Sequence, residues 1–326
     1  MRMHPSLTTS SRTDLTLGVL MMLLFSTAVQ GQSVEQLISS GDSLLRLEKP
    51  QRALEYYEKA VAAGPSALAL LGRAKAFYMT DRMDRFLIDV ENALRLDSTL
   101  GEAHYQRGLY AIRANDPSKA EFHGTMAIRH AADSTLKARS FILRGEALAE
   151  LKRYPAAILD IDHGIATGAN DTEAMRTLAR LLDQAGRHQE ALVMLERLCE
   201  LEPNDVGNWS NRGFELIMLE RFDEAMVMIE KALSIDKDEP VALSNRAYVN
   251  LKLGREQEAW TDIERSLRSY PSNPHALRTR ALLRLRKGER SKACEDLTLA
   301  KALGDVVEVD ALIKEHCATT PANKRR

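Results

Sequence analysis

The chain has 326 residues, of which 44% are apolar and 28% are charged, and its formal net charge at pH 7 is −1. This composition suits a folded protein with solvated helix surfaces, and the balanced charge argues against nucleic acid and other partners held by a strong electrostatic field. The length would allow two compact domains, but a repeat array of this length needs no central core.

Residues 1–31 have the pattern of an export signal. Arg2 and Arg12 precede the apolar run LTLGVLMMLLFSTAV, and small residues follow at Val29-Gln30-Gly31. Positive charge, a short apolar core and small residues, in this order, are typical of a cleaved signal peptide. The alternative is an uncleaved membrane anchor, although a core this short would span a bilayer only marginally. The pattern predicts export to an oxidising compartment, periplasmic or extracellular.

Residues 205–239 have the pattern of two short antiparallel helices. The periodicity predicts helices over 207–219 and 223–235 with a turn at 220–222. Bulky and small residues alternate on the faces that would touch: Trp209, Gly213, Leu216, Phe222, Ala225, Ile229 and Ala232. Small residues at Gly213 and Ala225 would let the two backbones approach closely.

The same pattern recurs along the chain. The position of Ala225 is held elsewhere by Ala53, Phe86, Ala120, Ala157, Ala191, Ala259 and Ala293. Successive members of this column are 33, 34, 37, 34, 34, 34 and 34 residues apart. One hairpin leaves apolar surface exposed, so copies of it are expected to stack and cover one another.

These columns resemble the tetratricopeptide repeat family, with its Trp, Gly, Tyr, Ala, Phe, Ala, Pro pattern. The resemblance implies an all-α fold, an α-α superhelix (solenoid) of helical hairpins over residues 32–317. Repeats are expected near 34–66, 67–100, 101–137, 138–171, 172–205, 206–239, 240–273 and 274–305, followed by a capping helix within 306–317. Residues 318–326 are short and polar, which predicts a disordered tail.

The third repeat is three residues longer than the standard period. We expect the extra residues to loop out in HAADSTLK, residues 130–137, because this segment is polar. Gly124 stands where the family has a large apolar residue. Weak packing there, together with the insertion, predicts a hinge in the superhelix.

The sequence offers no pattern for catalysis. It contains no Cys-x-x-Cys, no His-Glu-x-x-His, no glycine-rich phosphate loop and no Gly-x-Ser-x-Gly. The histidines are scattered over different repeats and lack the close helical spacing of a metal pair. We therefore expect no catalytic, cofactor-binding or metal-binding residues, no cofactor, no small-molecule substrate, and a protein that is not an enzyme.

Two cysteines near the C terminus are candidates for a disulfide. Cys294 lies in the last repeat and Cys317 ends the expected cap, which must fold back on that repeat to cover it. In an oxidising compartment this arrangement predicts a Cys294–Cys317 bond. Two packed, reduced cysteines are the alternative.

In most repeats an arginine stands directly before the small residue that is equivalent to Gly213. These arginines are Arg73, Arg107, Arg144, Arg212, Arg246 and Arg280. One interpretation is a basic ladder for an acidic ligand. The other, favoured by the balanced charge, is that each arginine lays its stem along the neighbouring hairpin and pairs with carboxylates such as Glu224 or Glu258.

The resemblance also implies where a partner would bind. In this family first helices line the inner face, at positions one, five and eight residues after that of Trp209. The candidates include a polar rim in the fifth repeat, with Arg176 and Arg180, and two possible backbone anchors, Asn211 and Asn245. The partner-binding candidates on this face are Arg176, Arg180, Ser210, Asn211, Phe214, Ile217, Met218, Ser244, Asn245, Tyr248 and Leu251. Ordinary packing within a tight superhelix is the alternative for these residues. The family's clamp for chaperone tails is doubtful here, because the asparagine expected at the position of Phe214 is missing.

The sequence thus predicts an exported, non-catalytic scaffold or adaptor that binds a peptide segment of another protein in its concave groove. A membrane-tethered assembly or secretion accessory factor, which would retain the N-terminal apolar segment, is the alternative. Membrane contact is expected only in that case.

Overall fold

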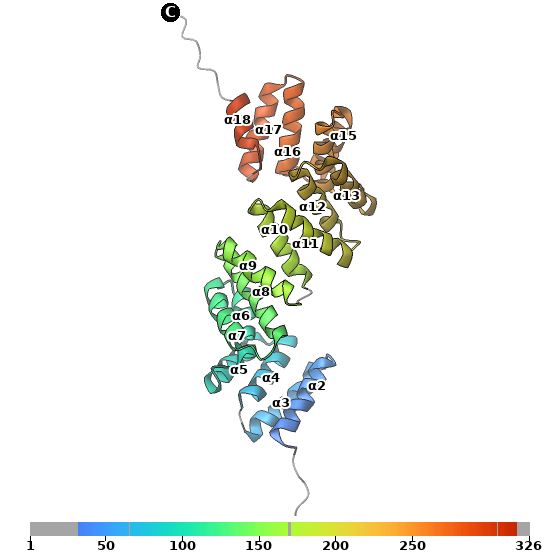
Figure 1. Cartoon of the computed structure of the whole chain (residues 1–326). Coiled ribbons are helices and arrows are strands. Elements are labelled where there is room, and N and C mark those ends of the chain that lie inside the picture. Colours follow the sequence, from blue (N-terminus) through green and yellow to red (C-terminus); the bar gives the residue numbers. More distant parts are fainter. Residues whose placement is uncertain (1–31, 65, 169–170, 305, 318–326) are drawn as a thin grey trace, which may run out of the picture. The chain divides into compact units, whose positions relative to one another are not determined.

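A computed structural model describes residues 32–64, 66–168, 171–304 and 306–317 (Figure 1). The predicted signal, 1–31, and the predicted disordered tail, 318–326, lie outside the described residues. Within the described residues the chain is all-α and contains no strand. None of the helices described is both long enough and apolar enough to cross a membrane.

Helices α2 to α17 form consecutive hairpins, and α18 follows them (Figure 1). The hairpins are α2 (Val34–Arg46) with α3 (Pro50–Ala63), α4 (Ala67–Met79) with α5 (Met83–Leu96), α6 (Gly101–Arg113) with α7 (Pro117–Arg129), α8 (Ser134–Glu150) with α9 (Tyr154–Ala166), α10 (Thr172–Gln184) with α11 (His188–Leu201), α12 (Val206–Met218) with α13 (Phe222–Ile235), α14 (Pro240–Lys252) with α15 (Glu256–Ser269), and α16 (Pro274–Arg286) with α17 (Arg290–Leu303). The last helix, α18, spans Val309–His316.

The chain divides into two units, with the boundary between Arg107 and Gly108 inside α6. In the first unit, small buried clusters join neighbouring hairpins, such as Leu71 and Ala93 with Ala103. In the second unit, separate clusters lie around α8 to α11, around α12 to α14 and around α16 to α18. Each unit therefore buries apolar surface hairpin by hairpin, as expected for a repeat array.

The small residues of the first helices are explained by the second helix of the same hairpin. A Cβ atom added to Gly213 would lie 2.6 Å from Cγ1 of Ile229, and one added to Gly145 would lie 2.5 Å from Cγ1 of Ile161. Separations this short are not tolerated between packed carbon atoms. Glycine at these positions makes room for an isoleucine sixteen residues later, as the sequence pattern predicts.

Each turn inside a hairpin contains one residue in the left-handed backbone region. These residues are Glu48, Asp81, Asn115, Lys152, Gly186, Glu220, Gly254 and Gly288. Their recurrence follows the repeat period, so the turn geometry is part of the repeated unit. Glycine is the residue that adopts this conformation without steric cost, yet several of these turns use other residues.

The structure contradicts the expected loop at residues 130–137. Helix α8 begins at Ser134 and has 17 residues, whereas α6 and α10 have 13. The side chain of Asp133 accepts a hydrogen bond from the backbone N–H of Leu136 at 2.7 Å, and Leu136 is buried. The extra residues therefore lengthen the first helix of the fourth hairpin, because an N-cap and a buried leucine stabilise another helical turn.

The weak packing expected at Gly124 is not found, and the hinge stays a prediction. A Cβ atom on Gly124 would lie 3.0 Å from Cβ and 3.3 Å from Cα of Arg144. The missing side chain lets α7 and α8 approach closely, so this junction is tightly packed.

The arginine column is held by carboxylates within the repeats. Four of its members form two-pronged pairs with an aspartate sixteen residues later: Arg73–Asp89, Arg144–Asp160, Arg246–Asp262 and Arg280–Asp296. Where that position is not an aspartate, the arginine turns to the preceding repeat, and Arg107 pairs with Glu91 and Arg212 with Glu196.

These pairs correct part of the sequence prediction. The column pairs locally, as the favoured interpretation held, but the partners are not Glu224 or Glu258. Glu224 pairs with Arg221 in its own first turn. An aspartate in the middle of the second helix faces the arginine directly, so it can accept both guanidinium hydrogen bonds.

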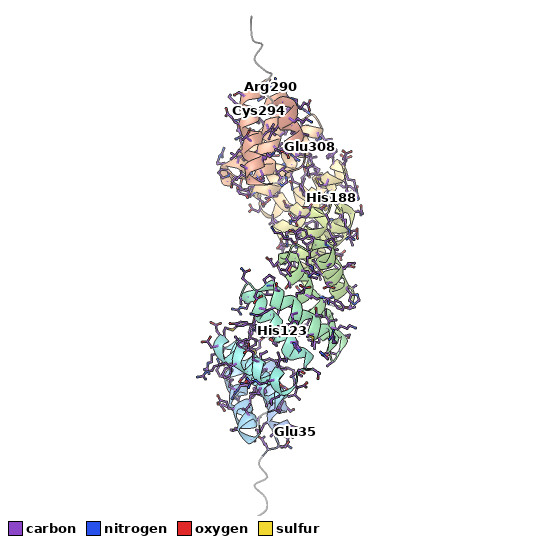
Figure 2. The ribbon with its side chains drawn as sticks, turned by 90° about the vertical axis from the view of Figure 1, so that its left-hand side faces the viewer. Glu35, His123, His188, Arg290, Cys294 and Glu308 are labelled. Atoms are coloured by element: carbon purple, nitrogen blue, oxygen red, sulfur yellow. A yellow bond between two sulfur atoms is a disulfide. The ribbon has the colours of Figure 1, made fainter. Side chains whose placement is uncertain are left out.

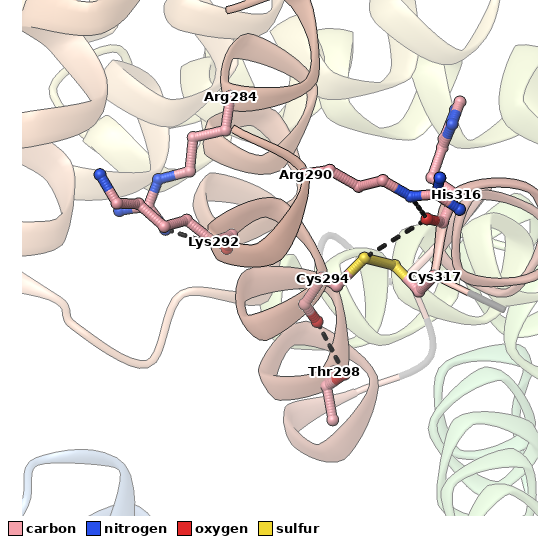
Figure 3. The surroundings of a disulfide bond; sticks show 7 residues. All are labelled: Arg284, Arg290, Lys292, Cys294, Thr298, His316 and Cys317. Carbon is pink, nitrogen blue, oxygen red and sulfur yellow. Dashed lines mark hydrogen bonds between the residues drawn. A yellow bond between two sulfur atoms is a disulfide. The ribbon is translucent and has the colours of Figure 1, made fainter. Parts of the chain in front are cut away.

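The capping helix α18 packs on α17, and their contact buries Val306 and Val309 with Leu297. The cap helix lies within the predicted range and begins after Glu308, whose backbone is in the left-handed region. Cys294 of α17 and Cys317 at the end of α18 form a disulfide with an S–S distance of 2.04 Å (Figure 3). Nearby, the Arg290 guanidinium donates to the backbone carbonyl of His316, so the cap is tied to α17 at its C-terminal end (Figures 2 and 3).

Candidate functional site

Most of the predicted partner-binding residues of the sixth and seventh repeats are buried between first helices. Ser210 and Ser244 are each 1% exposed, Leu251 is 2% exposed, and Ile217, Asn245 and Tyr248 are also buried. The physical reason is that α14 contacts α12 on one side and α16 on the other. These residues therefore do not form an exposed apolar wall, and packing between first helices accounts for them.

Two contacts show how this packing is made. The side-chain amide of Asn245 donates a hydrogen bond to the backbone carbonyl of Ser210 at 3.2 Å, which ties α14 to α12. The guanidinium of Arg278, on α16, lies 4.3 Å from the ring centroid of Tyr248 and covers it. Met218 remains partly exposed at the end of α12.

A cavity of about 450 Å³ lies one repeat earlier, between α10 and α12. It is lined by Glu173, Arg176, Thr177, Ala179, Arg180, Asp183, Leu195, Asn211, Phe214 and Glu215. Four of the sequence candidates, Arg176, Arg180, Asn211 and Phe214, therefore border one cavity. The cavity lies on first helices, as the candidates do, but nearer the fifth repeat than most of them.

Two arginines line this cavity, and only one of them forms ion pairs with described residues. Arg176 forms ion pairs with Glu202, Glu173 and Asp205, so its position is fixed by the turn that leads into α12. Arg180 is exposed and makes no ion pair with any residue the structure describes. Asn211 is exposed across the cavity, and the half-buried Phe214 ring meets the ring of His275 edge to face at 5.4 Å.

Two carboxylates of the cavity lining, Asp183 and Glu215, lie close to an imidazole. His188, the first residue of α11 (Figure 2), has its Nδ1 atom 2.9 Å from Oε2 of Glu215 and 3.5 Å from Oδ1 of Asp183. Glu215 is 3% exposed. Burial, with the nearby charge of Asp183, raises the pKa of Glu215 to about 8, and burial also raises the pKa of Asp183. A buried carboxylate that resists ionisation is a feature of functional sites.

This triad was not predicted from the sequence, from which no metal-binding residues were expected. Asp183, His188 and Glu215 lie on three different helices, and their spacing matches no short motif. One signal was present in the sequence, because Glu215 directly precedes Leu216 and Ile217 on the side of α12 that is buried. A single acidic residue on such a face does not reveal its partners.

A second polar cluster lies beside Phe214 on the side of α16. The side chain of Arg278 is 5% exposed and has no carboxylate partner among the described residues, although it donates to the carbonyl of Val307. Burial lowers the pKa of His275 to about 4, and the charge of Arg278 contributes. The gap between these side chains is only about 10 Å³, which leaves room for no more than about one water molecule.

Comparisons with known proteins agree with the hairpin array. Tetratricopeptide repeat family models match residues 39–100 and 206–239. The crystal structure of YrrB, described as a TPR protein with an unusual peptide-binding site, has a TM-score of 0.52 and 24% identity and covers 58% of this chain and 97% of YrrB. A tetratricopeptide repeat protein from Parabacteroides merdae covers 88% of this chain and 100% of its own length, with 17% identity and a TM-score of 0.47.

A curated relative is the tetratricopeptide repeat and J domain-containing co-chaperone DNJ1 of Cryptococcus neoformans var. grubii, which is 25% identical over 197 residues. The match covers 56% of this chain and 38% of that relative, so the chain spans well under half of its length. Both family models fall on hairpins described above, and the repeat period extends the same pattern over the rest of the array. The chain therefore has the tetratricopeptide repeat fold, and tetratricopeptide repeat models match two of its segments.

Proposed function

We propose that this protein is a non-catalytic scaffold that binds a peptide segment of a partner protein in the cavity between α10 and α12. The observation that carries the proposal is the cavity itself. Its volume, about 450 Å³, falls within the range of ligand-binding pockets, roughly 300–1,000 Å³. Tetratricopeptide repeat arrays are generally scaffolds for protein–protein interaction, and this cavity lies on the first helices of two successive repeats.

The lining residues favour a particular kind of segment. Phe214 and Leu195 offer apolar surface for one side chain of the peptide. Arg180, which has no ion-pair partner among the described residues, could pair with a carboxylate. Asn211 can hydrogen-bond the backbone of an extended chain. The expected ligand is therefore an extended segment with an apolar residue close to an acidic one.

The descriptions of two relatives are compatible with this class of ligand. DNJ1 is a co-chaperone, and YrrB is described as having a peptide-binding site. Each description belongs to that protein. The reason for proposing a peptide ligand here is the cavity of this chain.

We also propose that the chain is exported. The charged, apolar and small residues of segment 1–31 support this, as does the Cys294–Cys317 disulfide, since such bonds persist in oxidising compartments. Intact-mass measurement of the protein recovered from its native host is the test. Cleavage after Gly31 would leave Gln32 first, whereas a retained segment would favour the membrane-tethered alternative.

The binding site is tested by crosslinking followed by affinity measurement. A photo-crosslinking residue at position 211 should label one partner segment, which is then synthesised as a peptide. We expect Arg180→Ala and Phe214→Ala each to weaken this peptide about tenfold or more, as central interface residues do. The matched control is Arg268→Ala, an exposed arginine on the second helix α15. Equal affinity for all variants would show that the peptide binds elsewhere.

A further inference from the structure

We propose that Asp183, His188 and Glu215 form a binding site for a divalent first-row transition metal, with Zn²⁺ as the ion that suits it best. The three residues come from α10, α11 and α12. One potential ligand atom from each side chain lies within 4.8 Å of the other two. A metal here would join the fifth hairpin to the first helix of the sixth.

The separations suit a tetrahedral ion. Zn²⁺ bound to nitrogen and oxygen at about 2.0–2.2 Å places its ligands about 3.4 Å apart. In the structure His188 Nδ1 lies 2.9 Å from the Glu215 carboxylate and 3.5 Å from that of Asp183. Only small side-chain adjustments would be needed to place an ion among the three.

The donor set selects the class of metal. One imidazole with two carboxylates is a ligand combination used for zinc and for other transition metals, whereas Mg²⁺ and Ca²⁺ prefer oxygen ligands alone. Cys199 is the one described cysteine outside the disulfide, and it is buried at the other end of α11. We therefore expect nitrogen and oxygen ligation without sulfur.

Charge compensation is a second, independent reason. Glu215 is almost fully buried, and its carboxylate has no lysine or arginine partner among the described residues. A buried carboxylate beside a second carboxylate is costly unless a cation accompanies it. A divalent ion would supply that charge, and in its absence a proton does so.

The site also has an entry path. Asp183 and Glu215 line the 450 Å³ cavity, so an ion can reach them from solvent. Three protein ligands leave a fourth position free for water or for a donor from a bound molecule. The proposal does not depend on peptide binding, because the triad and its access are properties of the chain alone.

The test is zinc titration of the untagged, chelator-stripped protein with its disulfide intact, by isothermal calorimetry. We expect one Zn²⁺ per chain. Glu215→Gln and His188→Gln should each weaken binding about 100-fold or more, since even outer-shell losses cost about 10–100-fold. X-ray absorption of the loaded protein should show ligands at about 2.0–2.2 Å and no sulfur near 2.3 Å.

The matched control is His316→Gln, which removes a histidine that contacts Glu315 near the C terminus. It should bind Zn²⁺ as the unmodified chain does. Glu215→Gln preserves side-chain shape and introduces no charge, so it should remain folded, which circular dichroism checks. The proposal is wrong if the unmodified protein binds no stoichiometric zinc, if Glu215→Gln and His188→Gln bind it equally well, or if sulfur appears among the ligands.

Discussion

Arg246 on α14 donates hydrogen bonds from Nε and Nη2 to the two carboxylate oxygens of Asp262 on α15, at 2.7 and 2.8 Å. The carboxylate is 4% exposed and the guanidinium side chain 27% exposed. The same pair, at the same separation of sixteen residues, recurs in three other hairpins. It joins the two helices of each hairpin beside the small residue that lets them approach.

Asp262→Asn should destabilise the protein by about 2–3 kcal/mol, because Arg246 would lose its counter-charge in a half-buried position. Urea unfolding followed by circular dichroism measures the change. Glu224→Gln, which breaks the more exposed pair with Arg221, is the control and should cost much less, because solvent screens an exposed ion pair. Equal costs for the two variants would contradict the importance of burial.

The fifth repeat suggests how the stability lost in Asp262→Asn could be restored. Leu178 and Met194 stand at the positions equivalent to Arg246 and Asp262, and both pack in the core. Replacing the pair by Arg246→Leu with Asp262→Met should therefore recover most of the stability lost in Asp262→Asn, since apolar replacement of both partners leaves no charge unpaired. The same urea titration provides the comparison.

Gly254→Ala should destabilise the seventh hairpin by about 1 kcal/mol. Gly254 has φ of 78°, a conformation that a side chain disfavours, although the space around it is open. Gly64→Ala is the control, because Gly64 also has open space but lies in the extended region at φ of 173°. Thermal unfolding should show a lower midpoint for Gly254→Ala, and no lower midpoint for Gly64→Ala. A loss of the same size in both variants would mean that backbone strain is not its cause.

Reduction of Cys294–Cys317 should free the cap α18. The bond closes a loop with a sequence separation of 23, for which the chain-entropy model gives about 3 kcal/mol. Hydrogen exchange should become faster in α18 and at its contact with α17, while α8 and α9 remain protected. Cys317→Ser should reproduce the effect without reductant. Unchanged protection of α18 in both experiments would show that apolar packing alone holds the cap.

We expect the stability of the metal-free protein, prepared with a chelator, to depend on pH because the pKa of Glu215 is raised. Its pKa is raised from 4.5 to about 8 by burial and by Asp183. Between these values the unfolded chain has lost the proton that the folded chain still holds, so the free energy of unfolding falls as pH rises from about 4.5 to about 8.

Glu215→Gln removes this effect. We compare the free energy of unfolding of the variant with that of the unmodified protein. This difference should be more favourable to the variant at pH 8 than at pH 5, by on the order of 1–3 kcal/mol. Urea titrations at the two pH values measure the difference. Glu230→Gln, at an exposed position on α13, should show no comparable gain. A pH-independent difference between Glu215→Gln and the unmodified protein would mean that Glu215 is ionised in both states.

The hairpins were predictable because their main contacts are local. A glycine in the first helix leaves room for a large residue sixteen positions later, as Gly213 does for Ile229 and Gly145 for Ile161, and this separation is visible in the sequence. The insertion in the third repeat was harder to place. Asp133 can end a loop or cap a helix, and only the burial of Leu136 shows that the helix extends.

The candidate site was predictable only in part. Arg180, Asn211 and Phe214 border a cavity on the first helices named from the sequence, and their role in binding stays a prediction. Ser210 and Ile217 are buried, and so are Ser244 and Leu251 at the same positions of the next repeat. Adjacent first helices leave no space for solvent there. The spacing of successive first helices is not encoded in the repeat period.

By itself, the sequence determined an all-α array of eight hairpins and the two cysteines at its C-terminal end. These features depend on residues a fixed, short distance apart, and a periodic pattern records such distances directly. The tertiary structure alone decided which first-helix residues remain open to solvent and that Asp183, His188 and Glu215 meet. Both depend on how side chains from three helices share one space, and that space is defined only when the hairpins are packed together.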